Sequence, residues 1–370
     1  MSGVIDLSSG QVIEPLAEPA LKALAETVSA REVTAYAASG GESGLRSAVA
    51  AHYARRVGSD VDPEQITVTA GARHGLFSVA AASAADGEIL VPEPRWSHYP
   101  EMLRIAGARP VPVPGDPANG WLPDPDRLEA ARTGRTKAVV VNSPVNPTGA
   151  VYDTETLAAI RAWCAQHGLL LVVDDIYWAY GGEDAGGVRA GACEVVVGGA
   201  SKVHALAGLR VGWVWADAAL TAAVRTIVEH TTGPVSTLAQ PAVAAVLDRQ
   251  QDAVPDRVRR LDALREHAVR TMSAVPAVRV IVPRGGIYLC LDTSGLAKAR
   301  PEWRDDRVLC AALAEHAGVR LRPGSTFGLP GHVRLCVAAV PGLLSEAAGR
   351  LSEFLGTAAI GAAGKSEGLR

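Results

Sequence analysis

The chain has 370 residues, 48% of them hydrophobic and 20% charged. This length exceeds the point at which one hydrophobic core stops growing, so we expect one large domain and one smaller domain. The formal net charge of −3, from 36 basic and 39 acidic residues, is too balanced for a nucleic-acid-binding or polybasic membrane-binding surface.

The cysteines and the N-terminus indicate the compartment. Five cysteines are scattered without CxxC spacing, and we expect no metal site. The cysteines in apolar surroundings, which are typical of core residues in a reducing compartment, are Cys164, Cys290, Cys310 and Cys336. The N-terminus lacks the basic and apolar regions of a signal peptide, and no apolar stretch approaches the roughly 20 residues of a spanning helix. These features predict a cytoplasmic protein.

From about residue 44 to residue 230, short apolar runs alternate with longer alanine-rich segments at helical spacing. The runs predict seven strands, at residues 65–70, 88–92, 109–113, 137–142, 169–173, 194–198 and 211–216. The segments between them predict helices at residues 44–57, 74–83, 153–167 and 218–230. Nearly continuous apolar strands separated by helices indicate an α/β fold with a mostly parallel sheet covered on both faces.

Beyond this region the pattern changes. Residues 255–274 predict a long amphipathic helix, and residues 278–283 and 287–292 predict a strand pair. Strands at 319–322 and 332–337 and a helix at 343–355 complete a smaller α+β unit. We expect a large domain at residues 31–274, a small domain built from residues 1–30 and 275–357, and a flexible tail at residues 358–370.

Lys202 follows a predicted buried strand, in the segment GGASKVHALAGLRVGW. A lysine in such a place is usually a surface residue, and its significance comes from the residues that accompany it. In chain order these are Asn146 in NSPVNPTGAVY, Asp174 and Tyr177 in VVDDIYWAY, Arg210 eight residues after the lysine, and Arg334 in GHVRLCVA.

These motifs, in this order and at this separation, resemble the fold-type I aminotransferases of class I/II, in particular relatives of the bacterial aspartate aminotransferases. The resemblance runs from about Asp6 to Leu355. It implies a seven-stranded sheet sandwiched by helices, a smaller α+β domain, the cofactor pyridoxal 5′-phosphate bound to the large domain, and a homodimer.

The resemblance also implies roles for the residues around the cofactor ring. Lys202 would hold the cofactor as a Schiff base and then move a proton, and Asp174, following a buried strand, would face the protonated pyridine nitrogen. Asn146 and Tyr177 would hydrogen-bond the 3′-oxygen of the ring. Trp96, in PEPRWSHYPEM, would stack on the ring, although a lone tryptophan at a helix start is more often core packing.

The cofactor phosphate requires hydrogen-bond donors and positive charge. Residues 69–74 join a predicted strand to a predicted helix, which directs free backbone N–H groups toward an anion. The resemblance places the phosphate on the amides of Ala72 and Arg73 and on the guanidinium of Arg210. Many relatives have Ser or Thr three residues before the lysine, where this chain has Gly199. We therefore expect fewer phosphate contacts than usual.

Substrate contacts follow from the same resemblance. Arg334 would bind the α-carboxylate through two parallel hydrogen bonds, and the backbone of Gly10 would close over it, with Trp96 and Asn146 also in contact. Tyr36 would reach the phosphate of the partner chain. The side chains that could choose the substrate are Glu14, Arg73, Arg95, His98 and Arg322, although arginines are mostly surface residues.

The favoured hypothesis is an aminotransferase that moves an amino group between an α-amino acid and a 2-oxo acid. One alternative is another reaction of the same cofactor on an amino acid, namely elimination, cyclisation, decarboxylation or oxidation. A second is a non-enzymatic sensor module of the kind that follows a helix-turn-helix domain in some transcription regulators. This chain starts directly at the first segment of the enzyme, which favours the enzyme.

Overall fold

The computed structural model describes residues 3–30, 34–182, 185–188, 190–191 and 193–363, with backbone alone at 250–252 and 357–363. Its centre is a seven-stranded sheet in the order β2-β8-β7-β6-β5-β3-β4. The strands are β2 (Ile66–Thr69), β3 (Glu88–Glu93), β4 (Arg109–Pro114), β5 (Thr136–Asn142), β6 (Leu170–Asp174), β7 (Glu194–Gly199) and β8 (Gly212–Trp215). The predicted sheet is confirmed, and β8 alone runs in the direction opposite to the other six strands.

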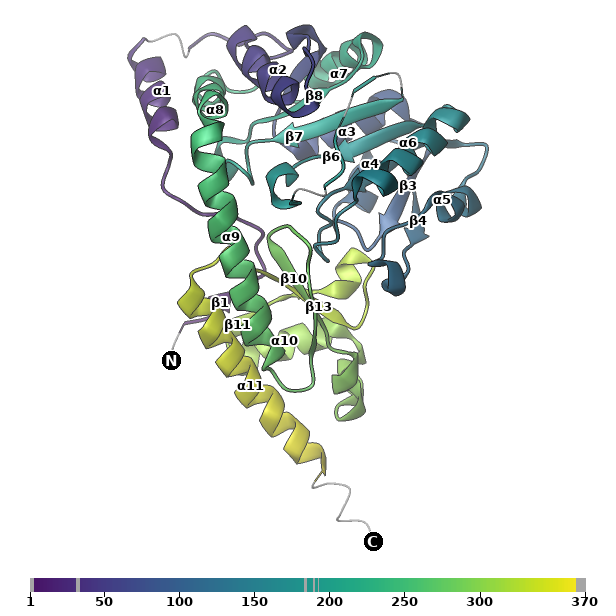
Figure 1. The fold of residues 1–370 in the computed structure, drawn as a ribbon, viewed down its shortest axis with the longest axis vertical. Coiled ribbons are helices and arrows are strands. Elements are labelled where there is room, and N and C mark those ends of the chain that lie inside the picture. Colours follow the sequence, from purple (N-terminus) through teal and green to yellow (C-terminus); the bar gives the residue numbers. More distant parts are fainter. Residues whose placement is uncertain (1–2, 31–33, 183–184, 189, 192, 364–370) are drawn as a thin grey trace.

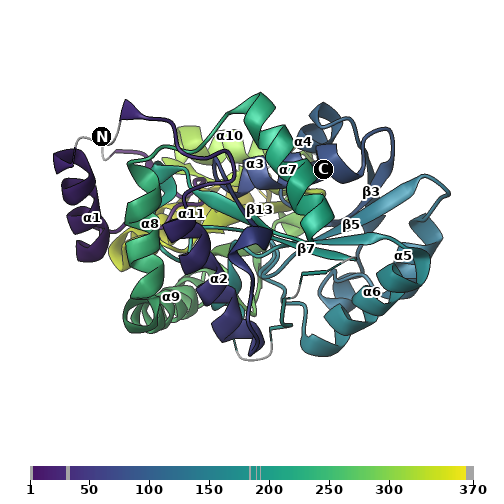
Figure 2. The same ribbon diagram turned by 90° about the horizontal axis from the view of Figure 1, so that it is seen from above.

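Helices cover both faces of this sheet because its central strands are apolar on both sides. On β5, Val139 and Val141 belong to one hydrophobic cluster, whereas Ala138 and Val140 belong to the other. The first cluster contains residues of α2 (Ser43–Val57), α5 (Pro125–Ala131), α6 (Thr154–His167) and α8 (Ala239–Asp248), and the second contains residues of α3 (Ala72–Ser83), α4 (Tyr99–Ile105) and α7 (Ala218–Thr231). Figures 1 and 2 show the resulting three layers.

A second sheet lies below the first in Figure 1. It is antiparallel, in the order β12-β13-β10-β9, with strands β9 (Arg279–Ile281), β10 (Tyr288–Asp292), β12 (Arg322–Pro323) and β13 (His332–Cys336). A separate parallel pair joins β1 (Ile5–Asp6) to β11 (Val319–Arg320). The helices around them are α9 (Gln250–Ser273), α10 (Asp306–His316) and α11 (Pro341–Ala363).

Two sequence-based boundaries in this part are wrong. The single strand predicted at residues 319–322 is two short strands in two different sheets, with the buried Leu321 between them, because the chain changes its pairing partner there. The predicted helix at 343–355 continues to Ala363, through a stretch rich in alanine, the best helix former. The tail predicted at 358–370 is therefore helical up to Ala363, and residues 364–370 lie outside the described residues.

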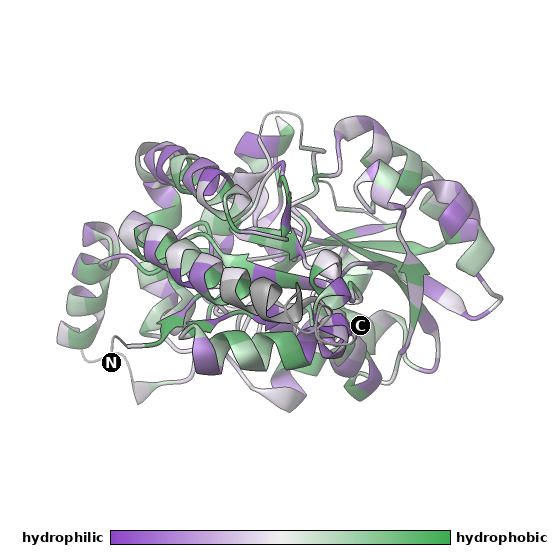
Figure 3. Ribbon diagram, turned by 90° about the horizontal axis from the view of Figure 1, so that it is seen from below, coloured by the Kyte–Doolittle hydropathy of each residue, from purple (hydrophilic) through white to green (hydrophobic). Residues whose placement is uncertain are grey.

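The remaining helix is α1 (Glu18–Ser29), which packs along α8. No prediction covered α1, α4, α5, α8 or α10. Strands coloured as hydrophobic in Figure 3 pass between helices whose colours alternate, as expected for amphipathic helices on a buried sheet. No described helix is long and apolar enough to cross a membrane. The four cysteines predicted to be core residues are buried, and the two-domain division stays a prediction.

A buried ion pair anchors α2 to the end of β6. Both oxygens of the Asp175 carboxylate accept from the Arg56 guanidinium, and Asp175 is 5% exposed. The Tyr53 hydroxyl, on the same helix, donates to Asp175 at 3.4 Å. Asp175 therefore serves packing, which leaves Asp174 alone to face the cavity at the end of this strand.

We predict that Arg56→Ala lowers the free energy of unfolding by about 3 kcal/mol, because it leaves the buried Asp175 carboxylate without its counter-charge. Arg104→Ala is the matched control, since its ion pair with Glu101 is exposed, and we expect a loss within about 1 kcal/mol. Denaturant unfolding of both variants measures the difference. Equal losses in the two variants would contradict the structural role of Asp175.

Candidate active site

A cavity of about 720 Å³ lies between the large sheet and the second sheet. Ten of the eleven predicted site residues line it: Gly10, Ala72, Arg73, Trp96, Asn146, Asp174, Tyr177, Lys202, Arg210 and Arg334. The eleventh, Tyr36, is not among the lining residues and is 95% exposed. Segments separated by more than 300 residues in sequence thus meet in one cavity.

The floor of the cavity is formed where parallel strands end. Asn142 ends β5, Asp174 ends β6, and the two residues are opposite each other in the sheet register. The Asn142 side chain donates to the Asp174 carbonyl at 3.0 Å, and Tyr99 Oη donates to Asp174 Oδ2 at 2.6 Å. Burial raises the pKa of Asp174 to about 6. The carboxylate is therefore held in one orientation in a place where negative charge is costly.

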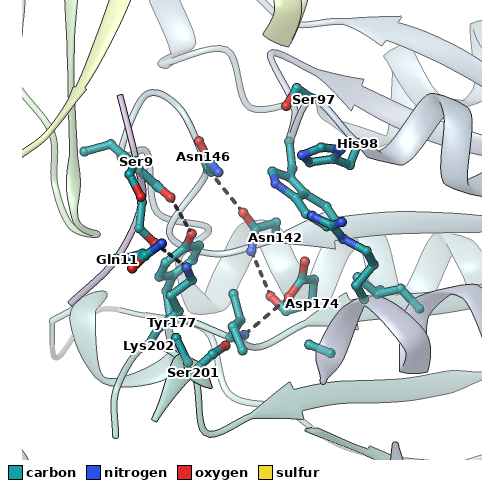
Figure 4. A pocket seen from close by; sticks show the side chains of 18 of the residues that line it. Ser9, Gln11, Ser97, His98, Asn142, Asn146, Asp174, Tyr177, Ser201 and Lys202 are labelled. Atoms are coloured by element: carbon teal, nitrogen blue, oxygen red, sulfur yellow. Dashed lines mark hydrogen bonds between the residues drawn. The ribbon is translucent and has the colours of Figure 1, made fainter. Parts of the chain in front are cut away.

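Lys202 comes shortly after the end of β7, the strand that pairs with β6. Its Nζ donates to the Gly10 carbonyl, which brings the N-terminal segment across the cavity. Burial lowers the pKa of Lys202, and the charges of Arg334 and Arg210 act in the same direction. A buried amine with a lowered pKa can lose its proton and act as a nucleophile or a base. Figure 4 shows Lys202, Tyr177 and Asp174 on the same side of the cavity.

Arg334 is a buried cation, 4% exposed, and among the described residues no carboxylate pairs with it. One terminal nitrogen donates to Asn146 Oδ1 at 3.0 Å, the other donates to the Ser8 carbonyl at 2.6 Å, and its Nε has no partner within the described part of the chain. The guanidinium lies 4.1 Å from the centre of the Tyr288 ring. A buried cation held only by neutral groups is suited to an anionic ligand.

Tyr288 and Asn146 both contact Arg334 directly. Tyr177 and Tyr288 share a hydrogen bond of 3.1 Å between their hydroxyls. Because Asn146 Oδ1 accepts from Arg334, its amide nitrogen is the group that can donate into the cavity. A Cβ atom at Gly10 would lie 1.8 Å from the Tyr288 hydroxyl, so this backbone can close over the site only with glycine.

The N-terminus of α3 points donors at the opposite end of the cavity. Gly71 precedes the helix with φ +80°, and Ala72 and Arg73 begin it. A Cβ at Gly71 would lie 2.5 Å from a terminal nitrogen of Arg210, so the guanidinium lies against this turn. Backbone N–H groups, the helix dipole and a guanidinium together make an anion site. Gly199 does not line the cavity, whereas Ser201 does.

Of the five side chains that could choose the substrate, the structure places three in the cavity and two in ion pairs. Arg73, His98 and Arg322 line the cavity. Arg95 pairs with Glu93, and Glu14 pairs with Arg257 and Arg260. Neither Arg95 nor Glu14 is among the lining residues, so neither contacts a substrate in this cavity. Sequence reasoning missed Asn142, Tyr99 and Tyr288, although Asn142 ends a strand as Asp174 does, and Tyr99 follows Trp96 by three residues.

Comparisons with known proteins agree with this geometry. The model of the family "Aminotransferase class I and II" matches residues 2–351. The aspartate aminotransferase of Streptomyces avermitilis is 34% identical over 96% of this chain and 90% of its own length. The aspartate/prephenate aminotransferase of Thermus thermophilus is 35% identical, over 91% of this chain and 88% of its own. A solved structure titled aspartate aminotransferase from Thermus thermophilus with maleate has a TM-score of 0.88 at 31% identity, covering 95% of this chain and 91% of its own.

The chain belongs to the class I and II aminotransferases. It is a pyridoxal 5′-phosphate enzyme that transfers an amino group between an α-amino acid and a 2-oxo acid, and the alternative reactions of the cofactor are not favoured. The cofactor supplies an aldehyde that bonds an amino group and a ring that withdraws electrons from it. The cavity fits it, with an anion site at the start of α3, a buried carboxylate in the floor, and an Arg334 Nε that has no partner among the described residues.

The raised pKa of Asp174 predicts how the stability of the cofactor-free protein changes with pH. The folded-state pKa of about 6 exceeds the unfolded value, so the folded state binds the proton more tightly and stability falls as pH rises from about 4 to about 6. At pH 8, Asp174→Asn should therefore be more stable than the natural protein, by up to about 3 kcal/mol. The difference should vanish near pH 4.

Denaturant unfolding of the cofactor-free protein at the two pH values measures this, with Asp126→Asn at an exposed position as the matched control. A natural protein that equals or exceeds the Asp174→Asn variant in stability at pH 8 would contradict the buried-carboxylate account.

Proposed function

We propose that Lys202 is the residue that would hold the cofactor covalently, its amine condensing with the aldehyde with loss of water, and that its freed amine would then carry the proton that is moved during transfer. Support comes from the placement of its amine, which is buried in the cavity, has a lowered pKa and lies next to the carbonyl of Gly10. That hydrogen bond holds the free amine near the substrate side of the site. A lysine in water would be protonated at neutral pH and could not serve either purpose.

Asp174 faces the pyridine nitrogen in this proposal. A protonated ring nitrogen beside it would remove the cost of the buried negative charge, and in return the carboxylate would keep the ring protonated. Tyr99, at the start of α4, orients the Asp174 carboxylate through its hydroxyl. The phosphate would be held by the start of α3 and by Arg210, and Asn146 and Tyr177 would contact the 3′-oxygen, since all of these residues line the cavity.

Arg334 binds the substrate α-carboxylate in this account. The guanidinium is already fixed by Asn146, Ser8 and the Tyr288 ring, so little side-chain entropy is lost when the carboxylate binds. This fixed position sets the direction of the Cα–H bond relative to Lys202. Closure of the Gly10 backbone over the carboxylate excludes water from the reacting atoms.

We further propose that the active protein is a cytoplasmic homodimer in which Tyr36 reaches the phosphate of the partner. An aromatic side chain that is 95% exposed, a few residues from α2, is unusual unless another surface covers it. The buried, unpaired cysteines are consistent with a reducing compartment.

Lys202→Ala tests the covalent proposal. We expect the variant to lose the visible absorption of the lysine-bound cofactor and to lose transamination. In the natural protein, borohydride reduction should fix the cofactor mass on the peptide that contains Lys202. Lys137→Ala, at an exposed lysine, should behave like the natural protein. An unchanged spectrum in Lys202→Ala would refute the assignment.

Tyr36→Phe tests the shared site. Removing one hydroxyl that donates to a charged phosphate should weaken cofactor binding about 10- to 100-fold, because such hydrogen bonds contribute about 1.5–3 kcal/mol. Equilibrium dialysis gives the affinity, and sedimentation velocity gives the oligomeric state. Unchanged affinity together with an active monomer would exclude this arrangement.

A further inference from the structure

Arg257, on α9, holds two distant parts of the chain at once. It is 8% exposed. Its Nε donates to the Glu14 carboxylate at 2.9 Å, one terminal nitrogen lies 2.8 Å from the same carboxylate, and the other terminal nitrogen donates to the Val203 carbonyl at 2.7 Å. Glu14 comes four residues after Gly10, and Val203 is the residue after Lys202. One buried guanidinium therefore joins the N-terminal segment to the turn that carries the lysine.

We call residues 8–14 the covering segment. Ser9 and Gln11 line the active-site cavity, and both also line a second cavity of about 570 Å³. In Figure 4 they lie on the same side of the active-site cavity as Lys202. Val12 is buried in the hydrophobic cluster of the second sheet, but Ile13 is exposed. With cavities beside it, the covering segment is held less by packing than by the contacts near its two ends.

Those two ends are fixed in different ways. At one end, Leu7 makes backbone hydrogen bonds of 3.0 and 2.8 Å to β11 and β13. At the other end, Glu14 is held by ion pairs to α9. Between them, the Gly10 carbonyl accepts from Lys202 Nζ. The place of this carbonyl over the lysine therefore depends on the ion pairs of Glu14.

Arg257 and Arg260 both pair with Glu14, and they differ in two respects. A terminal nitrogen of Arg260 lies 3.0 Å from the carboxylate, but the Arg260 side chain is 60% exposed, and such exposed pairs contribute little. Among the described residues, Arg260 has no hydrogen bond to the lysine turn. The other side chain on that turn is Tyr180, whose hydroxyl donates to the Lys202 carbonyl at 3.4 Å. Arg257 alone of the two arginines thus connects the turn with the covering segment.

We propose that Arg257 is a positioning residue that, through Glu14 and the Val203 carbonyl, keeps the covering segment in register with Lys202. The inference rests on the proposed function, since it takes Lys202 as the residue that holds the cofactor. A planar guanidinium suits this task, because its donors point in fixed directions toward two acceptors at once. Glu14 then positions the segment over the site.

Hydrogen exchange of the cofactor-loaded enzyme, followed by mass spectrometry, measures how firmly the two parts are held. In Arg257→Gln, the amides of residues 8–14 and 203–206 should exchange about tenfold faster, because both attachments are lost. In Glu14→Gln, faster exchange should be confined to residues 8–14, since Arg257 still holds Val203. Arg260→Gln is the matched control, and it should change exchange in either part by less than about twofold.

The amine of Lys202 gives a second readout, which a loss of stability alone would not change. The rate at which acetic anhydride acetylates Lys202 at a series of pH values, in protein freed of cofactor, gives its pKa. Burial is the main reason that the pKa of Lys202 is low, so a displaced covering segment admits water, and this pKa should rise in both Arg257→Gln and Glu14→Gln. A purely electrostatic effect would differ in sign between the two variants, because they remove opposite charges.

The outcomes separate positioning from other roles. If Arg257→Gln does not fold, Glu14→Gln decides through exchange at residues 8–14 and the Lys202 pKa. Unchanged exchange there in Glu14→Gln, or a Lys202 pKa that rises in Arg257→Gln and falls in Glu14→Gln, would overturn the positioning role. The proposed function fails separately, because the absorption spectrum of Lys202→Ala tests the covalent bond in a chain whose Arg257 is intact.

Discussion

The site depends on one constraint, the burial of a carboxylate at the end of a parallel strand. The side chain of Asp174 lies where ionisation is costly, Tyr99 fixes its carboxylate, and Asn142 holds its main-chain carbonyl. A buried carboxylate needs a positive partner, and in the proposed function the protonated ring of the cofactor would be that partner. Because β5, β6 and β7 are parallel neighbours, the same edge that carries Asp174 also carries Asn142 and leads to Lys202. The cofactor residues are thus brought together by strand direction.

The residues proposed to bind the substrate come from elsewhere in the chain. Arg334 is on β13 of the second sheet, and Gly10 lies in the N-terminal segment that follows β1. The loops after β6 and β7 join the two parts, since Tyr177, Tyr180 and Val203 pack in the hydrophobic cluster of the second sheet. A change in how these parts meet would therefore move Arg334 relative to Lys202.

Much of this could be predicted from the sequence because the physical signals are local. The central strands β5, β6 and β7 have continuous apolar runs, and the polar residues Asn142 and Asp174 stand at the ends of β5 and β6. What could not be predicted depends on contacts between distant residues. The pairing of β8 against β7, the division of residues 319–322 between two sheets, and the bond from Tyr99 to Asp174 are set by tertiary packing. Short helices such as α4 have too few turns for a clear period.

Arg322 illustrates the same limit. In the sequence it is one arginine among many, and arginines are usually exposed. Only the register of β12 against β13 shows that it stands next to Arg334 in the cavity. Pairing between strands, rather than residue type, places it beside Arg334.

The central claim is that this cavity performs amino transfer, and a single-turnover measurement tests it most directly. The cofactor-loaded enzyme is mixed with one amino acid at a time, with no 2-oxo acid acceptor, and the products are quantified. The account predicts one equivalent of the matching 2-oxo acid per active site and then no further reaction. Steady release of ammonia, carbon dioxide or peroxide over many turnovers would contradict it.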